Sequence, residues 1–440
     1  MFFLRKLLAP ATKAVHGMLD IDAVIHSGVC ASVDISLPSF LRFRQEYSIV
    51  RRFSLIILAV VVGRAYAADP LLETNNIFPP GNKHAHSSSI VECPDDSLLT
   101  CWFYGSGERK ADDVVVQGAR LNKGATSWSP VFLMADTPGF PDCNPVLFID
   151  STDRLWMYWI CVLAERWECS QLKYRRADVA SGAGVPKWDW QDVIQLKPGP
   201  TFGTAMKVRF NQLGVKNGMW AEYAKPYHRM LLESADDPYK RQTGWMTRTH
   251  PQTLPSGRIL VPLYSDGFNT ALMAISDDHG ETWRASSPIV GLAPIQPTLA
   301  RRRDGTLVAF CRDSGGPPAR ALVSESKDDG ETWSPAIDCD IPNPGSSLEV
   351  IRLADGQWLL IANDTERVRN RLSVMLSDDE GYSWTTKRQV EPREEPGQFD
   401  YPSVIQSRDG MIHLTYSCTT ASGRCIRHCV FNTEWVEAAE

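Results

Sequence analysis

One eight-residue pattern occurs three times in the C-terminal half of the chain, as SDDHGETW (276–283), SKDDGETW (326–333) and SDDEGYSW (377–384). All three match Ser-x-Asp-x-Gly-x-x-Trp, and they follow one another at offsets of 50 and 51 residues. In such a turn the aspartate accepts hydrogen bonds from backbone N–H groups, the glycine takes a positive φ, and the tryptophan packs back onto the repeat. We therefore interpret these boxes as structural turns without a chemical role.

A repeat of about fifty residues that is rich in short β-type runs predicts a β-propeller, with one four-stranded antiparallel blade per repeat. The runs RILVPLY (258–264), TLVAFCR (306–312) and QWLLIAN (357–363) are β-branched or aromatic and lie between turn residues. No stretch shows convincing helical periodicity. The sequence therefore predicts an all-β fold.

Weaker echoes of the box end near Trp128 and Trp188, and a last repeat begins with YPSVIQ (401–406). Together with the three boxes they predict six blades, although the count leaves five or seven open. We expect the first strand of the mature chain to join the C-terminal blade and close the ring. The irregular region 200–250 is interpreted as an insertion.

Composition bounds the function as well as the fold. The 440 residues are 43% hydrophobic and 22% charged, which is ample for one large core, and the formal net charge is -6. Residues 68–440 carry 38 Lys and Arg against 48 Asp and Glu. An acidic body of this kind repels nucleic acid and anionic membranes.

The segment RRFSLIILAVVVGRAYAA (51–68) has a basic start, a short apolar stretch and a small-x-small exit ending at Ala67. This is typical of a secretory signal, and the apolar stretch is too short to span a bilayer. We therefore predict a doubtful N-terminal extension over 1–50, a signal peptide over 51–67 and one propeller domain over 68–440. The mature protein is then exported, without an integral membrane span.

Eleven cysteines occur in the chain, none in a CxxC pair. An oxidising compartment permits disulfides, and Cys161 with Cys169, or Cys418 with Cys425 or Cys429, are the close pairs. One sequence does not fix their connectivity.

Several further stretches make the chain similar to a neuraminidase-like branch of the Asp-box sialidase superfamily. They include HAHSSSIVECPDDSLLTCWFYGSGERKADDVVV (84–116), CNPVLF (143–148), IQPT (295–298), AFCR (309–312), IPNPGSS (341–347) and DYPSVIQSRDGMIHLTYS (400–417). The resemblance implies a six-bladed propeller and a retaining glycoside hydrolase that acts on terminal acidic sugars of glycans. Sialidases hold the substrate carboxylate with arginines, attack with a tyrosine that a glutamate activates, and use an aspartate as acid/base.

The resemblance assigns candidates to each of these roles. Tyr401 is the expected nucleophile, and a neutral phenol approaches an anionic sugar with less repulsion than a carboxylate would. Arg312 and Arg371 are the expected carboxylate anchors, because a planar guanidinium binds a carboxylate through two hydrogen bonds. Glu108 or Asp113 is the expected acid/base. The competing interpretations are a packed aromatic, surface arginines paired with carboxylates, and a solvated turn.

The chain departs from the family at one element. The arginine-isoleucine-proline motif that supplies the first anchoring arginine is absent, and HAHSSSI (84–90) stands in its place. We therefore expect His84 or His86 to face the pocket, the alternative being hydrogen-bonded core histidines. Glu349 and Glu222 are the candidates to partner Tyr401. The remaining polar positions that match this branch, and that otherwise serve as turn residues, are Lys207, Asn144, Gln296, Asn343, Asn363 and His428.

Two rivals to the sialidase-like hydrolase stay open. One is a propeller hydrolase or lyase on another acidic polysaccharide that uses His84 or His86, and the other is a non-catalytic propeller that binds glycans or proteins. The sequence contains no GxSxG, HExxH, GxGxxG or phosphate-loop motif, and its histidines have no metal-ligand spacing. We therefore expect a glycan substrate without a metal or a cofactor, while the oligomeric state stays open.

Overall fold

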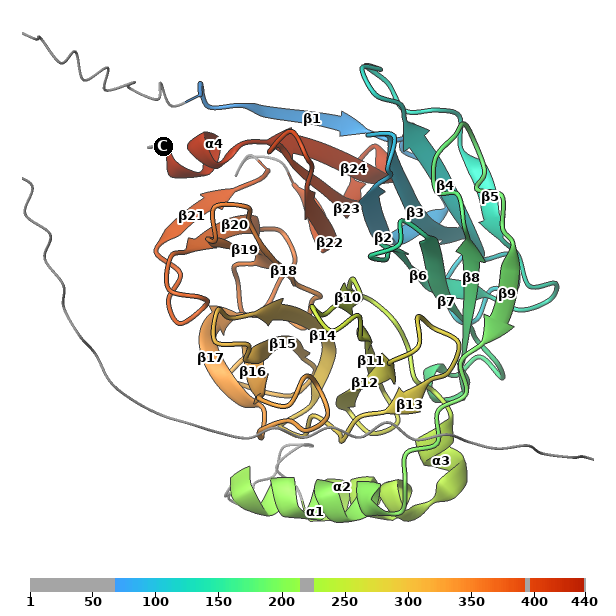
Figure 1. Ribbon diagram of the computed structural model, residues 1–440, viewed down its shortest axis with the longest axis vertical. Helices are drawn as coiled ribbons and strands as arrows, with labels where there is room; N and C mark the ends of the chain where they lie inside the picture. Colours follow the sequence, from blue (N-terminus) through green and yellow to red (C-terminus); the bar gives the residue numbers. More distant parts are fainter. Residues whose placement is uncertain (1–67, 214–224, 392–395, 439–440) are drawn as a thin grey trace, which may run out of the picture. The chain divides into compact units, whose positions relative to one another are not determined.

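Six four-stranded antiparallel sheets form a ring of propeller blades in the computed structural model, which describes residues 68–213, 225–391 and 396–438 (Figure 1). Blade 1 is β2 (His84–Glu92), β3 (Leu98–Gly105), β4 (Val115–Leu121) and β5 (Phe132–Ala135). Blade 2 is β6 (Asp142–Ile149), β7 (Leu155–Cys161), β8 (Gln171–Ala177) and β9 (Trp190–Val193). Blade 3 is β10 (Gln252–Thr253), β11 (Ile259–Ser265), β12 (Thr270–Ser276) and β13 (Arg284–Ala285). Blade 4 is β14 (Pro294–Arg301), β15 (Leu307–Asp313), β16 (Arg320–Ser326) and β17 (Ile337–Pro342). Blade 5 is β18 (Glu349–Arg352), β19 (Trp358–Asn363), β20 (Leu372–Ser377) and β21 (Thr386–Gln389).

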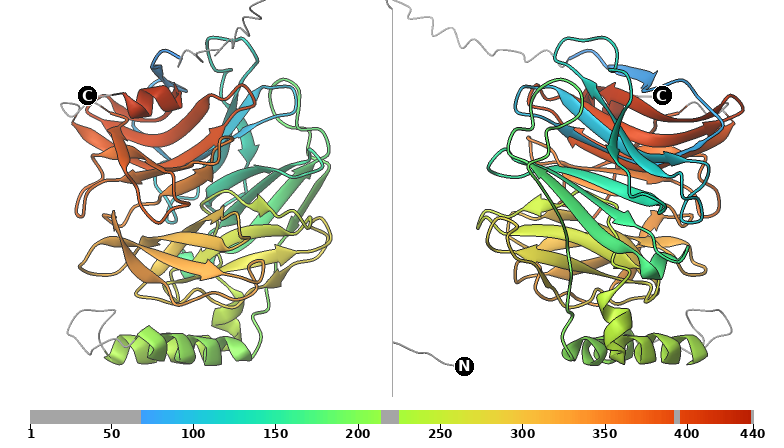
Figure 2. Two further views of the ribbon diagram at one scale, coloured as in Figure 1. Left: turned by 60° about the vertical axis from the view of Figure 1, so that its left-hand side comes forward. Right: turned by 90° about the vertical axis from the view of Figure 1, so that its right-hand side faces the viewer.

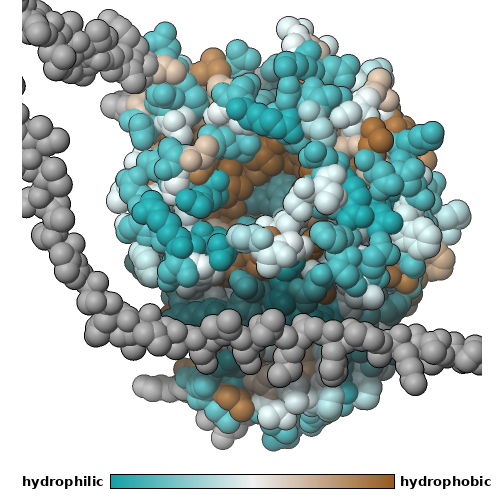
Figure 3. Space-filling model, in the orientation of Figure 1, coloured by the Kyte–Doolittle hydropathy of each residue, from teal (hydrophilic) through white to brown (hydrophobic). Residues whose placement is uncertain are grey.

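The sixth blade closes the ring. It combines β22 (Gly397–Gln406), β23 (Ile412–Thr420) and β24 (Gly423–Phe431) with β1 (Leu72–Asn76), which pairs with β24 from Leu72↔Phe431 to Asn76↔Arg427. The predictions of six blades and of closure by the first strand are confirmed. The ring encloses a hollow at its centre, rimmed mainly by hydrophilic residues (Figure 3).

The Asp boxes fasten neighbouring blades together. In the second box Asp328 accepts hydrogen bonds from the Ser326 hydroxyl (2.8 Å) and the Thr332 amide (2.9 Å). The box tryptophans pack across the gap between blades, as Trp283 does against Trp156 and Trp384 does against Phe310. The boxes are therefore structural turns, as predicted, but their tryptophans serve the interface with the preceding blade.

The insertion between blades 2 and 3 is helical, so the expectation of no helix was wrong. It holds α1 (Thr201–Leu213), α2 (Lys225–Asp236) and α3 (Pro238–Gln242), which lie outside the ring (Figure 2), and α4 (Thr433–Glu437) follows the last strand. Only Phe202, Gly203 and Met206 of α1 are buried. The apolar face is too narrow to give a clear helical period in the sequence.

All ten cysteines of the described residues are free thiols, although Cys418 and Cys425 are direct register partners on β23 and β24. The short η1 helix (Trp167–Cys169) follows β7. No helix in the described part of the chain is long and apolar enough to cross a membrane. The predicted extension and signal peptide (1–67) lie outside the described residues.

The box glycines give a test of blade packing. Gly280 has φ +85°, and a Cβ added there would lie 2.3 Å from a ring carbon of Trp156, whereas Gly410 has φ +89° with no atom within 4 Å of its added Cβ. We expect Gly410→Ala to cost about 1 kcal/mol through its backbone conformation alone. Gly280→Ala should cost roughly 1–3 kcal/mol more because the methyl group overpacks the interface. Urea unfolding of both variants measures the difference, and equal losses would contradict this account.

Candidate active site

The innermost strands carry a shared irregularity that positions side chains at the axis. Strands β2, β6, β14 and β22 each shift register at one point, where one residue has a positive φ: Ser87 (60°), Asn144 (48°), Gln296 (50°) and Tyr401 (55°). Such bulges turn a side chain out of the alternation of its strand. Three of these side chains, those of Asn144, Gln296 and Tyr401, therefore reach one central pocket.

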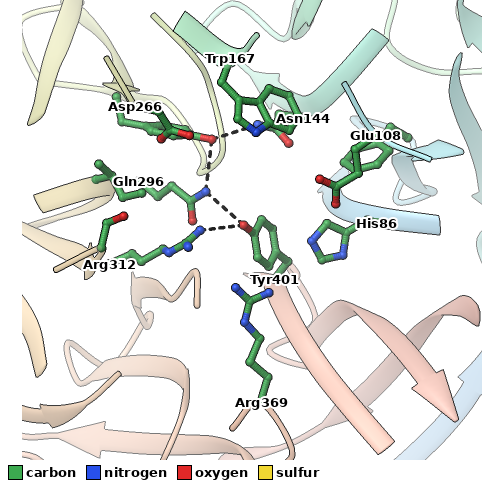
Figure 4. Close-up of a pocket in the computed structure, with 13 residues that line it drawn as sticks. His86, Glu108, Asn144, Trp167, Asp266, Gln296, Arg312, Arg369 and Tyr401 are labelled. Atoms are coloured by element: carbon green, nitrogen blue, oxygen red, sulfur yellow. Dashed lines mark hydrogen bonds between the residues drawn. The ribbon is translucent and has the colours of Figure 1, made fainter. Parts of the chain in front are cut away.

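This pocket has a volume of about 240 Å³. Its lining residues are His86, Phe103, Glu108, Asn144, Trp167, Tyr264, Asp266, Ile295, Gln296, Arg312, Ser314, Arg369 and Tyr401 (Figure 4). They come from the first five blades of the chain order and from β22 of the last blade, so the pocket exists only when the ring is closed. Six of the expected residues are brought together here: Tyr401, Arg312, His86, Glu108, Asn144 and Gln296.

Tyr401 occupies the middle of the pocket. Its hydroxyl oxygen accepts a hydrogen bond from Arg312 Nη1 (2.8 Å) and another from Gln296 Nε2 (3.3 Å), as Figure 4 shows. Gln296 Nε2 also donates to the Tyr264 hydroxyl (3.2 Å), which Asn144 Nδ2 reaches as well (3.1 Å). The Tyr401 oxygen is therefore the atom on which two N–H donors of the pocket converge.

Arg369, and not the expected Arg371, is the second arginine of the pocket. Arg369 Nη1 lies 3.0 Å from the Asp400 carboxylate, which is buried, and its guanidinium carbon lies 5.5 Å from the centre of the Tyr401 ring. Burial raises the pKa of Asp400, while the Arg369 charge beside it acts to lower it. Arg371 is exposed and lies two residues later, directly before β20. Arg369 and Arg371 are two residues apart, so in an extended chain their side chains would point to the same face. Strand alternation therefore does not tell which of the two enters the pocket.

The two expected acid/base candidates have different roles. Glu108 lines the pocket, and its carboxylate lies 3.6 Å from His84 Nδ1. Asp113 instead braces the loop: it accepts hydrogen bonds from the Ser106 hydroxyl (2.6 Å) and amide (2.9 Å), and it pairs with Lys83 (3.0 Å). These contacts, led by the Ser106 hydroxyl, lower the pKa of Asp113 to about 2. The geometry therefore favours Glu108 as the group that can exchange protons in the pocket.

His86 forms the wall beside Tyr401. The two ring centres lie 4.1 Å apart, and His86 Nδ1 is 3.7 Å from Asp400. Burial, and then the nearby His84 and arginine charges, lower the pKa of His86 well below its usual value. Burial also lowers the pKa of His84, which stacks on His86 outside the pocket. His86 is therefore a neutral imidazole at pH 7.

Several pocket residues were not predicted from the sequence. Tyr264 is the penultimate residue of β11, Asp266 directly follows that strand, and Trp167 lies in the short η1 helix. Asp266 lies on the Gln296 side of the pocket, opposite Glu108 (Figure 4), and the surrounding protein raises its pKa through loss of hydration. The strand-end argument that selected Arg312 would have found Tyr264 and Asp266. Nothing in the sequence around Trp167 indicates its place.

A residue pair in the sequence marks three of the bulges that supply the pocket. A proline follows the positive-φ residue in Asn144-Pro145, Gln296-Pro297 and Tyr401-Pro402. Proline lacks an N–H donor, and inside sheets it is confined to edges and bulges. A polar residue before proline at the start of an inner strand therefore marks the bulges that supply the pocket.

The remaining expected residues lie outside the pocket. Glu349 is buried, accepting hydrogen bonds from His250 and from the Val404 amide, and it does not contact the Tyr401 hydroxyl. Asn343 and Asn363 donate to backbone oxygens, His428 stacks on His413, and Lys207 lies on α1 near Asp236. Glu222 lies outside the described residues. No group of three or more His, Cys, Asp or Glu among the described residues could hold a metal ion.

Comparisons with known proteins agree with this architecture. A family model described as "BNR repeat-like domain" matches residues 96–247 and 243–414. The sialidase of Micromonospora viridifaciens is 30% identical over 176 residues, which are 38% of this chain and 26% of that protein. The anhydrosialidase of Macrobdella decora is 27% identical over 179 residues, 37% of this chain and 23% of that protein. The chain thus spans about a quarter of these curated relatives.

Solved structures share the fold at low identity. A protein of unknown function from Dyadobacter fermentans superposes with a TM-score of 0.60 at 14% identity, covering 82% of this chain and 98% of that one. The intramolecular trans-sialidase from Ruminococcus gnavus superposes with a TM-score of 0.59 at 12% identity, covering 83% and 98%. These matches establish the propeller fold.

The pairing of Arg369 with Asp400 gives a second prediction. We expect Arg369→Ala to cost about 3 kcal/mol in the free energy of unfolding, because it leaves a buried carboxylate without its cation. Arg371→Ala, two residues away on the same loop and exposed, should stay within about 0.5 kcal/mol of the wild type. Urea unfolding at pH 7 measures both, and a loss at Arg371 as large as that at Arg369 would sink the assignment.

Proposed function

The chain belongs to the family of proteins with a BNR repeat-like domain, and we propose that its central pocket hydrolyses the glycosidic bond of a terminal acidic sugar in the manner of a sialidase. The observation that carries the proposal is the Tyr401 hydroxyl, held by Arg312 (2.8 Å) and Gln296 in a pocket that also contains Arg369 and Glu108. The sialidase and anhydrosialidase relatives support the same reaction class.

Each of these pocket residues has a separate role in the proposed hydrolysis. Arg312 and Arg369 bind the sugar carboxylate, since guanidinium groups form paired hydrogen bonds with it. Tyr401 gives its phenolic proton to water, and its oxygen attacks the anomeric carbon while Glu108, as a carboxylic acid, gives its own proton to the leaving oxygen. Glu108 then takes a proton from water, and the resulting hydroxide displaces Tyr401 with net retention. Export after a signal over 51–67 is part of the proposal.

Removing the Tyr401 hydroxyl tests the nucleophile. We expect Tyr401→Phe to lower kcat on a fluorogenic sialoside by at least about 10³-fold, because the attacking atom is lost. Tyr174→Phe is the matched control, since the Tyr174 hydroxyl bonds to Trp190 in blade 2, away from the pocket. The protein used should begin at Ala68. Full turnover by Tyr401→Phe would refute the assignment.

Glu108 and Asp113 lie in the same loop, but only Glu108 is proposed to act in catalysis, whereas Asp113 stabilises the loop. We expect Glu108→Gln to lower kcat roughly 10²- to 10⁴-fold, because a glutamine amide neither protonates the leaving oxygen nor takes a proton from water. Asp113→Asn should lower kcat far less, because Asp113 bonds to Ser106 and Lys83 and not to the pocket. Steady-state kinetics on the same sialoside compares them. The assignment fails if Asp113→Asn costs as much kcat as Glu108→Gln does.

A second candidate function rests on a specific observation. Tyr401 must lose its proton to attack, yet among the described residues its oxygen is bonded only by the N–H donors of Arg312 and Gln296, and a glutamine amide is no base. In a lyase acting on a uronic-acid polysaccharide, neutral His86 takes the proton next to the carboxylate, and the Tyr401 phenol protonates the leaving oxygen. Arg312 and Arg369 then neutralise the carboxylate.

The products distinguish the two reactions. Elimination leaves an unsaturated uronate that absorbs in the near ultraviolet, whereas hydrolysis releases a saturated sugar. Saturable glycan binding without either product would instead support the non-catalytic propeller. Incubation with sialosides and with uronic-acid polysaccharides, followed by absorbance and chromatography of the products, separates the three cases.

A further inference from the structure

A buried cation lies beneath Tyr401, outside the pocket lining. The Arg248 side chain is 1% exposed, and its guanidinium carbon lies 5.0 Å from the centre of the Tyr401 ring. Arg248 Nη2 donates to the Pro402 backbone oxygen (2.7 Å), and Nη1 donates to the Ser88 backbone oxygen (3.3 Å). These two acceptors belong to the bulges of β22 and β2, so Arg248 is fixed to the segment that also fixes Tyr401.

The charges behind Arg248 do not cancel it. Glu349 accepts from the His250 amide (3.0 Å) and from His250 Nδ1 (2.8 Å), while His250 Nε2 lies 2.8 Å from the Ile90 backbone oxygen. An imidazole that faces an acceptor at both nitrogens is held as the doubly protonated cation. Burial lowers the pKa of His250, but the Glu349 carboxylate outweighs burial and leaves it raised. Glu349 is therefore paired with His250, and no carboxylate among the described residues lies within salt-bridge distance of Arg248.

A positive charge in this position acts on the electrons of the ring above it. Cations within about 6 Å of an aromatic face are attracted to it, and the attraction grows when both groups are desolvated. When the phenol becomes a phenolate, a negative charge develops on its oxygen and is partly delocalised into the ring, and the low local dielectric strengthens the interaction of that charge with a fixed cation. The benefit is thus larger for the ionised tyrosine than for the neutral one.

We propose that Arg248 is a positioning residue that stabilises negative charge on Tyr401 from below, while Arg312 and Gln296 do so from the side. This inference rests on the proposed use of Tyr401 as a reactive phenol, and it assigns a role to a buried arginine that cannot touch the substrate. The His250–Glu349 ion pair near Arg248 is neutral overall. Arg248 acts on the Tyr401 ring, whereas Arg312 acts on the Tyr401 hydroxyl oxygen.

The experiment follows ionisation of Tyr401 directly, independent of turnover. The protein is labelled with 3-fluorotyrosine, the Tyr401 resonance is assigned by its loss in Tyr401→Phe, and its 19F shift is recorded across pH. The variants are Arg248→Met, Arg248→Gln and Arg248→Lys. The charged or titratable groups around Tyr401 are His86, Glu108, Arg248, Tyr264, Asp266, Arg312, Arg369 and Asp400, and all except Arg248 stay unchanged in this series.

Arg120→Met is the matched control. Arg120 is 2% exposed, donates to the backbone oxygens of Gly184 and Ala180, and is not among the residues that line the pocket. Its loss removes a buried arginine of the same kind without touching Tyr401. It therefore reports how a generic loss of stability affects the measured signals.

Loss of the Arg248 charge should raise the pH at which Tyr401 ionises. Arg248→Met and Arg248→Gln move the Tyr401 ionisation to higher pH by about 1–3 pH units, while Arg248→Lys keeps most of the wild-type value and Arg120→Met keeps all of it. If the chain turns over an acidic glycoside, kcat falls roughly 10- to 100-fold in the two neutral variants and is largely restored by lysine.

An unchanged Tyr401 ionisation in both neutral variants overturns the inference, and so does a shift of equal size in Arg120→Met. Arg248→Gln keeps an N–H donor for the Pro402 oxygen, so it gives the answer if Arg248→Met does not fold. Absence of turnover by the wild-type protein on every acidic glycoside would overturn the proposed function instead. The 19F titration would still decide the effect of Arg248 on the phenol.

Discussion

A left-handed backbone residue in the innermost strand of a blade is the constraint on which the pocket depends. Outside glycine this conformation costs about 1–2 kcal/mol, and asparagine tolerates it better than glutamine or tyrosine does. Gln296 and Tyr401 nevertheless adopt it, because regular pairing on both sides of each bulge fixes the chain there. Strain of this kind at a pocket is a common mark of function. Here it lets residues more than a hundred positions apart share one hydrogen bond.

The second organising element is the balance of charge around Tyr401. Arg312 and Arg369 face the pocket and Arg248 lies below it, whereas Asp400 is the buried carboxylate that pairs with one of the three. Glu108 and Asp266 also line the pocket, so cations and carboxylates both surround the Tyr401 ring. In the proposed reaction Arg312 and Arg369 are the groups that bind a sugar carboxylate, and the low local dielectric strengthens that contact.

The sequence was sufficient for the fold because the signal is periodic. The three boxes state the repeat length, and the closing strand β1 follows from the need to leave no open edge. The resemblance to sialidases also indicated Tyr401 and Arg312, and it left Glu108 and Asp113 as alternatives that the contacts of the loop separate. Arg369 was missed for Arg371 because the path of a loop is set by tertiary contacts, here the Asp400 pair. Glu349 was misplaced because its backbone and histidine partners come from other blades.

Closure of the ring by β1 has a consequence for how the chain is made. The five residues of β1 are synthesised before any blade, yet their partner β24 is the last strand of the ring in chain order. The sixth sheet cannot form until all five other blades have left the ribosome, however early those blades are formed. Until β24 has been made, the backbone N–H and C=O groups of β1 have no partner strand. Ring assembly is consequently a late, all-or-none event, and the pocket forms with it.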